Sequence, residues 1–223
     1  MKLFRTVAVL AVAALAGTLV ASPAYADEGV PRLKTELTRR LELRLTALDR
    51  WDRVVEGAGR LTPEHKSALN TLIDENRTEL TQLKTEIAAD DTLAELRAHA
   101  EEMVYEHRIF LLVGPQVRLT IAGDAQALLL QKLRTLHGTL TQRVADAGND
   151  PAAVTNLGEM DAALDRAEAK TGEVDNVLAI QPGEDAAAIR AAVGAVRTDL
   201  GAVRTELKTA VAEAKAIRDI IKP

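Results

Sequence analysis

The sequence predicts an all-α protein, because three observations agree. Alanine, leucine and valine combine with glutamate, lysine and arginine, and aromatic residues make up only 2% of the chain. This composition is typical of helical bundles, since sandwiches and barrels use more aromatic side chains in their cores. Apolar residues recur at steps of three and four, which is the period of an α-helix. Cysteine is absent, so packing and not disulfide bonds must stabilise the fold.

Residues 1–26 have the features of a secretory signal peptide. Lys2 and Arg5 give a positive start, an apolar run follows at 7–20, and Ala24-Tyr25-Ala26 places small residues at the −3 and −1 positions of a signal-peptidase site. We therefore expect cleavage after Ala26 and a secreted, extracellular protein. The apolar run is shorter than the roughly 20 residues that a transmembrane helix needs, so we expect no stable membrane span after cleavage.

The charge balance excludes one broad class of partner. The net charge of the chain is −5, and removal of Lys2 and Arg5 makes it more negative. A protein that binds nucleic acid in general needs a basic face. We therefore expect no nucleic-acid partner.

The first two helices are predicted from their ends and their apolar rows. The first is expected over 31–55, with Pro31 in its first turn. The second begins after Thr62, which can cap the free amides, and Pro63 fits its first turn. Its expected seam, the row of residues that faces other helices, is Leu69, Ile73, Asn76, Leu80, Leu83 and Ile87. Asn76 either fixes the register of packing or lies at a solvated edge, and the second interpretation is the simpler one.

The third helix leads into an unusual apolar stretch. Thr92 and Glu95 form a capping box at its start. Its expected seam is Leu93, Leu96, Ala100, Met103, His107 and Phe110. The segment 109–113 is apolar all round, and Pro115 then removes one helical hydrogen bond. We expect a helix that is kinked at Pro115 and continues beyond it.

Two further helices are expected between residues 124 and 181. The fourth runs over 124–147 and ends at Gly148. Its expected stripe is Leu129, Leu133, Leu136, Leu140 and Val144. The fifth begins at Asp150-Pro151, its seam extends to Leu178, and a turn follows at Gln181-Pro182-Gly183.

The last helix has the clearest pattern. Five consecutive heptads cover 188–222, and all ten seam positions are apolar. These positions are Ile189, Val193, Val196, Leu200, Val203, Leu207, Ala210, Ala214, Ile217 and Ile221. Arginines flank one side of the seam and Asp199, Glu206 and Glu213 flank the other, as in the flanking positions of coiled coils.

Short connections between these helices favour antiparallel neighbours. We expect an elongated antiparallel helical bundle with coiled-coil-like packing, in which two three-helix bundles are joined through the proline-kinked helix. The signal peptide would cover 1–26, an N-terminal bundle 27–115 and a C-terminal bundle 116–223. The alternative, in which both halves fold back into one bundle, remains open.

Three segments carry a family resemblance. They are Leu61-Thr62-Pro63-Glu64-His65-Lys66, the run LTQLKTEIAADD at 80–91, and YEHRIFLLVGPQV at 105–117. Together they resemble an uncharacterised family of small secreted α-helical proteins of high-GC Gram-positive bacteria. The resemblance implies the fold and export, and it implies no activity. A weaker similarity links Leu61-Thr62 to the LTxxQ motif of periplasmic stress chaperones, but His65 stands in place of the glutamine, and a helix cap explains the segment better.

The side chains available for chemistry nearly exclude nucleophilic catalysis. Cysteine is absent, and Ser67, the one serine after residue 26, has no nucleophile motif around it. His99, Met103 and His107 recur at steps of four and could ligate a transition metal or haem. Met103 and His107 also lie on the packing seam, where core packing accounts for them. We therefore expect no catalytic residue, no cofactor and no metal.

The apolar stretch is the other candidate site. Phe110, Leu112, Pro115 and Val117 would form a partner surface if neighbouring helices leave them uncovered. The alternative is that they form the core of the junction between the two bundles.

Two function classes remain open. The first is a secreted, non-enzymatic interaction or scaffold protein that binds an unknown protein or cell-wall partner, with self-association through helix seams as a variant. The second is an extracytoplasmic carrier or holdase-type chaperone for apolar ligands or unfolded clients.

Overall fold

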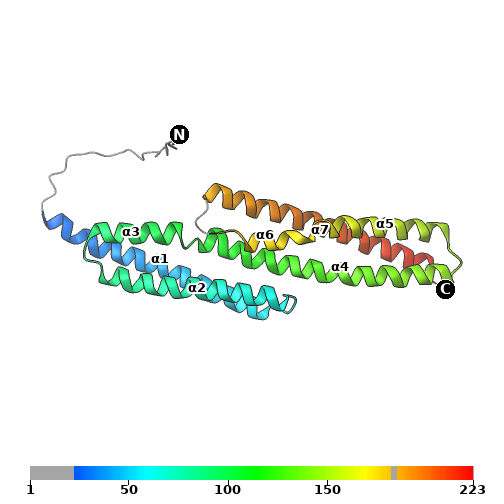
Figure 1. Cartoon of the computed structure of the whole chain (residues 1–223), viewed down its shortest axis with the longest axis horizontal. Helices are drawn as coiled ribbons and strands as arrows, with labels where there is room; N and C mark the ends of the chain where they lie inside the picture. Colours follow the sequence, from blue (N-terminus) through cyan, green and yellow to red (C-terminus); the bar gives the residue numbers. More distant parts are fainter. Residues whose placement is uncertain (1–22, 182–184, 223) are drawn as a thin grey trace, which may run out of the picture.

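A computed structural model of the chain describes residues 23–181 and 185–222, and every regular element in this part is a helix. The predicted all-α fold is therefore confirmed. The elements are α1 (Pro23–Gly57), α2 (Pro63–Ala89), α3 (Leu93–Tyr105), the π-helix η1 (Ile109–Val113), α4 (Gly114–Asp146), α5 (Pro151–Glu168), the 3₁₀ turn η2 (Thr171–Glu173), α6 (Val174–Leu178) and α7 (Ala186–Ile220). They form an elongated molecule in which α1–α3 lie toward one end and α4–α7 extend to the other (Figure 1).

The helices α1, α2 and α3 share one apolar core. The predicted seam of α2 is confirmed, because its five apolar members are buried. Asn76 is half-buried and donates to the carbonyl of Leu72 in its own helix at 2.8 Å, as expected at a helix edge. The prediction for α1 needs a correction, since the helix begins at Pro23 and encloses Pro31.

The predicted starts of α2 and α3 are confirmed by their caps. The Thr62 hydroxyl accepts a hydrogen bond from the amide of His65 at 3.2 Å. Thr92 and Glu95 form the reciprocal capping box that the sequence predicts. Hydrogen bonds from the Thr92 hydroxyl and from the Asp91 and Thr92 amides lower the pKa of Glu95. This carboxylate therefore stays ionised at the positive end of α3.

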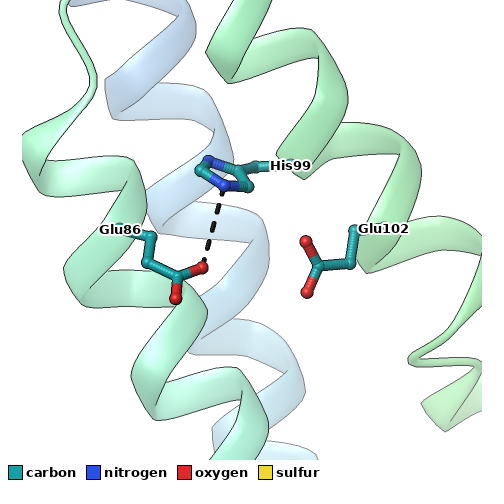
Figure 2. Close-up of side chains that lie close together, drawn as sticks. All are labelled: Glu86, His99 and Glu102. Carbon is teal, nitrogen blue, oxygen red and sulfur yellow. Dashed lines mark ion pairs between the residues drawn. The ribbon is translucent and has the colours of Figure 1, made fainter.

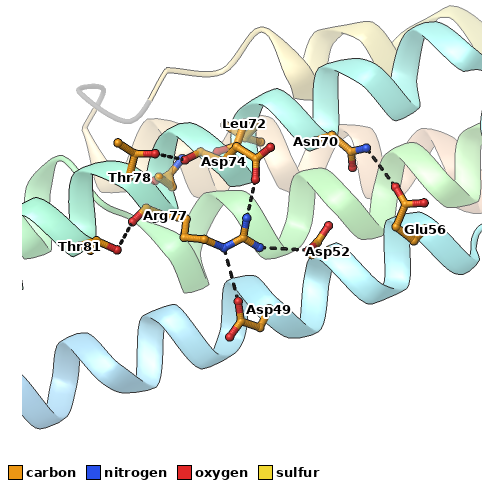
Figure 3. Close-up of polar contacts among 10 residues, drawn as sticks. Asp49, Asp52, Glu56, Asn70, Leu72, Asp74, Arg77, Thr78 and Thr81 are labelled. Atoms are coloured by element: carbon orange, nitrogen blue, oxygen red, sulfur yellow. Dashed lines mark hydrogen bonds and ion pairs between the residues drawn. The ribbon is translucent and has the colours of Figure 1, made fainter.

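Each half of the molecule contains one arginine that joins two helices through three carboxylates. In the first half, Arg77 of α2 lies 3.1 Å from Asp52 and 3.4 Å from Asp49, both on α1, and also pairs with Asp74 (Figure 3). In the second half, Arg134 of α4 reaches three carboxylates of the α5 region, those of Asp161 (2.8 Å), Asp165 (2.5 Å) and Glu168 (2.7 Å). The hydrogen bond to Asp165, followed by that to Glu168, raises the pKa of Arg134.

The prediction of a kink at Pro115 is wrong, because the chain changes direction before this residue. α3 ends at Tyr105, and Pro115 lies in the first turn of α4, directly after η1. The wider π turn between them places the amide of Gly114 on the carbonyl of Ile109, five residues back. The chain therefore changes direction through a break at 106–108 and a π-helix rather than through a kinked continuous helix.

The first three turns of α4 form the joint between the two halves. Apolar residues on opposite faces pack into different cores, since Val117 joins the core of α1–α3 and Leu119 joins a separate cluster with α6 and α7. Two buried polar side chains tie the joint to distant segments. The Asp124 carboxylate accepts from the Thr62 amide at 2.7 Å, and Gln116 donates to the carbonyl of Val177 at 3.0 Å. The predicted boundary between residues 115 and 116 therefore falls inside an element that packs against both halves.

The second half is built from α4, α5 and α7. The predicted seam of α7 is confirmed, because nine of its members are buried and Ile221 is partly buried. α5 ends at Glu168, earlier than expected, and η2 and α6 follow as separate short elements. The predicted turn at Pro182-Gly183 lies outside the described residues. None of the helices described here combines the length and apolarity that a membrane span requires.

Gly114 packs closely against Trp51 in the joint. A Cβ atom at this residue would lie 3.1 Å from Cζ2 of Trp51, whereas one at Gly138, also on α4, would meet nothing within 4 Å. We predict that Gly114→Val lowers the free energy of unfolding by about 1–3 kcal/mol through overpacking. Gly138→Val should leave it nearly unchanged. Urea denaturation of both variants measures the difference, and equal midpoints would contradict the close packing of Trp51.

Candidate functional site: a basic apolar groove between α4 and α7

The structure divides the predicted partner surface. Leu112, Pro115 and Val117 are buried in the joint, so the expectation that they contact a partner is wrong and the alternative of a junction core applies. The reason is that α6 and α7 cover one face of this segment while α1 and α2 cover the other. Phe110 alone is exposed, at 60% of its surface, with the Arg44 guanidinium 5.9 Å from the ring centroid.

The predicted row of His99, Met103 and His107 does not act as one unit. Met103 is buried in the core of α1–α3, as its seam position predicts. His99 instead pairs with Asp90 at 2.8 Å, and His107 is buried next to carboxylates of α2 and α3. The sulfur and the two imidazoles therefore have different surroundings.

A longer groove, which no sequence pattern predicted, runs between α4 and α7. It consists of two adjoining depressions, of about 450 and 310 Å³, that meet at Val211. We call it the α4–α7 groove. Its apolar floor is formed by Leu129, Leu133, Leu136, Leu140, Leu207, Val211 and Ala214. Its rims carry five cations, Arg143, Arg204, Lys208, Lys215 and Arg218.

The groove exists because α5 covers only one side of the α4–α7 pair. α4 and α7 run in the same direction, and α5 returns antiparallel to both (Figure 1). The acidic flank of α7 faces α5, where Arg166 pairs with Glu206 at 2.9 Å and Lys170 pairs with Asp199 at 2.5 Å. The hydrogen bond to Glu206 raises the pKa of Arg166. The acidic flank predicted from the heptads is thus partly used inside the molecule.

The cations of the groove lack carboxylate partners across it. Within the described ranges, Arg143, Arg204, Lys208 and Lys215 form no ion pair, and no carboxylate lines the groove. Arg218 pairs only with its neighbour Asp219, at 3.1 Å. Hydrogen bonds from Lys222 and then Arg218 lower the pKa of Asp219. In a chain with a net charge of −5, this surface is a local concentration of positive charge.

The apolar floor is partly open to water. Leu129, Leu136 and Val211 are 41%, 40% and 47% exposed. The prediction that Leu129 and Leu136 lie on a buried stripe is therefore wrong, whereas Leu133, Leu140 and Val144 are buried as predicted. Consecutive leucines at 128–130 give α4 more apolar surface than one neighbouring face can cover, and this excess was the signal in the sequence.

The groove has the length of a short helix. From Arg204 to Arg218, α7 rises by about 21 Å, at about 1.5 Å per residue. The lining residues of α4 advance in step with those of α7, so the groove is continuous along two parallel helices.

Comparisons with protein-family models, with curated proteins and with solved structures find no match to this chain.

Proposed function

We propose that the protein is an exported, non-enzymatic helical interaction protein, and that its α4–α7 groove binds an acidic amphipathic helix of a partner protein. The single observation that carries this proposal is the apolar floor between rims of cations that have no carboxylate opposite them. A helix that lays its apolar face into a groove is a common mode of peptide recognition.

The cations on the rims of the α4–α7 groove favour a negatively charged partner. Unpaired arginines and lysines beside an apolar strip attract carboxylates and repel other cations, which gives specificity and faster association. Within the protein itself, α7 already uses this pairing on its other flank, where its carboxylates meet Arg166 and Lys170 of the α5 region. A partner helix with glutamates beside a leucine row would complement the basic flank in the same way.

The length of the α4–α7 groove favours a short helix as the partner. A helix of about 14 residues matches the 21 Å of the groove. It would complete a four-helix arrangement with α4, α5 and α7, and it would cover the exposed parts of Leu129, Leu136 and Val211. A carrier or holdase, the second function class, would use the same apolar floor but would not require acidic groups in its client.

Export is supported by the N-terminal sequence. Lys2 and Arg5, the apolar run at 7–20 and the small residues before Asp27 are the features that signal peptidase recognises. Residues 1–22 lie outside the described part of the chain, and cleavage after Ala26 would remove the first four residues of α1.

Cleavage has a direct test. We predict that the protein recovered from the medium of a secreting bacterial host begins at Asp27, because Ala24 and Ala26 satisfy the −3 and −1 positions. N-terminal sequencing or intact mass gives the result. Replacement of Ala26 by Arg should block processing, and retention of residues 1–26 in the unaltered secreted chain would contradict the proposal.

The groove is tested with a designed peptide of 14–18 residues that carries leucine on one face and glutamate on the flanks. We predict that Leu136→Asp weakens binding at least tenfold, because it places a carboxylate on the apolar floor. Arg204→Glu should weaken binding several-fold and reduce its dependence on salt. Fluorescence anisotropy measures both effects, and circular dichroism checks that each variant keeps its helicity.

Matched controls lie in the first half of the molecule. Leu43→Asp places the same change on an exposed leucine of α1, and Arg97→Glu places the same charge reversal on an exposed arginine of α3. Both should bind as the unaltered protein does. The proposal would be wrong if the acidic peptide failed to bind, or if a lysine-flanked peptide of the same length bound equally well. Equal binding of both peptides, with an uncharged hydrophobic dye also held, would favour the carrier.

A further inference from the structure

A second groove, between α2 and α3, has a different chemistry. Its lining includes the carboxylates of Glu79, Glu86, Glu102 and Glu106 together with His107, and its volume is about 560 Å³. Acidic side chains alone do not make a binding site, because exposed carboxylates are common on helix surfaces. Two histidines, His99 and His107, accompany these carboxylates, and neither is an exposed surface side chain.

His99 has one ring nitrogen fixed and the other aimed at carboxylates. Its Nδ1 lies 2.8 Å from Oδ2 of the buried Asp90, so this nitrogen donates its hydrogen to Asp90. The Nε2 atom then presents a lone pair toward Oε2 of Glu86 at 3.7 Å (Figure 2). Glu102 faces the same space, and the three ligand atoms lie within 4.8 Å of one another. A carboxylate behind a histidine is the arrangement that orients metal-bound imidazoles.

His107 provides the independent observation. His107 is only 4% exposed, and its buried Nδ1 atom has no hydrogen-bond partner. This nitrogen lies 3.6 Å from Oε2 of Glu79, and Nε2 lies 4.0 Å from Oε1 of Glu102. Both distances are too long for hydrogen bonds. A buried nitrogen without a hydrogen bond is destabilising, so this end of the groove has an unsatisfied polar group in the protein alone.

The two histidines and three of the glutamates form a ladder along the antiparallel pair α2 and α3. Glu86 lies opposite His99, Glu79 lies opposite His107, and Glu102 lies between the two pairs. In a tetrahedral zinc site with bonds of about 2.0–2.2 Å, neighbouring ligand atoms are about 3.3–3.5 Å apart. The nitrogen–oxygen separations of 3.7 and 3.6 Å are close to that spacing.

We propose that this groove binds one divalent transition-metal ion between His99 Nε2, Glu86 and Glu102. The pair of Glu79 and His107 lies next to this position but does not complete a second one, because Glu102 faces Nε2 of His107 and Glu79 faces Nδ1. Imidazole and carboxylate together suit Zn²⁺ or Co²⁺ better than Ca²⁺ or Mg²⁺, which prefer oxygen ligands alone. Bound metal would join α2 to α3 just before the break that precedes η1. The competing state is a His99 imidazole that pairs with Asp90 and Glu86 without metal.

The test is calorimetric titration of untagged protein with Zn²⁺, together with the visible absorption of the Co²⁺ complex. We expect one ion per chain and a raised melting temperature. His99→Gln should abolish binding, and Asp90→Asn should weaken it by about 10–100-fold. Glu102→Gln should also weaken it. His137→Gln is the matched control, because His137 is a partly buried histidine of α4 whose Nε2 lies 3.3 Å from the Leu157 carbonyl.

The outcomes separate cleanly. Absence of saturable Zn²⁺ binding would overturn the proposal in favour of the metal-free pairing of His99 with Asp90 and Glu86. Unchanged binding in His99→Gln would place the metal elsewhere and would also overturn it. Circular dichroism of each variant without metal shows that the helices remain folded.

Discussion

The rest of the structure depends on the enclosure of the first three turns of α4. This segment buries apolar side chains on two opposite faces, Val117 on one and Leu119 on the other, so it needs helices on both sides. The core of α1–α3 covers one face, and α6 with the start of α7 covers the other. The two halves of the molecule are therefore joined by a shared helix rather than by a linker. The buried Asp124 and Gln116 fix the orientation of the joint, because each satisfies backbone groups of a segment about 60 residues away.

A shared helix also determines what remains open. Beyond the joint, α4 is covered by α5 and α7 on one side only, so its surplus leucines and the basic flank of α7 line a groove. In the first half, α3 ends early at Tyr105, and the histidines before and after that end face α2 across carboxylates. Both proposed sites thus lie where the bundle packing stops short of enclosing a face. The first is apolar and positive, and the second is polar and negative, so they would attract different ligands.

Local patterns in the sequence predicted those features that depend on local interactions. The caps at Thr62 and Thr92 and the seam of α7 are satisfied within a turn or by a regular row of apolar residues. The break before η1 was missed because a π turn has no composition of its own. The π turn is followed by Gly114, where a Cβ atom would lie 3.1 Å from Trp51 of another helix, a contact that no local sequence pattern reveals. Phe110 was placed on the seam by counting from α3, and the break rotates it to the surface.

The candidate sites were harder to predict for the same reason. His99 and His107 were noticed as a row on one helix, but their carboxylate partners Glu86 and Glu79 lie on another helix, and only the packing of α2 on α3 brings them together. The two flanks of α7 were predicted correctly as opposite charges. Which flank would be used internally depended on the side that α5 occupies. Heptad patterns determine that a face is buried, but they do not determine which neighbour buries it.

The claim that α4 joins both halves can be measured by hydrogen exchange, followed amide by amide as urea is raised toward the midpoint of unfolding. If the first turns of α4 are enclosed from both sides, the amides of residues 116–124 should exchange among the slowest in the protein and only through global unfolding. Residues of both cores should share that single transition. Fast exchange of 116–124, with the two halves losing protection at separate urea concentrations, would show that the halves are independent and that the joint is a linker.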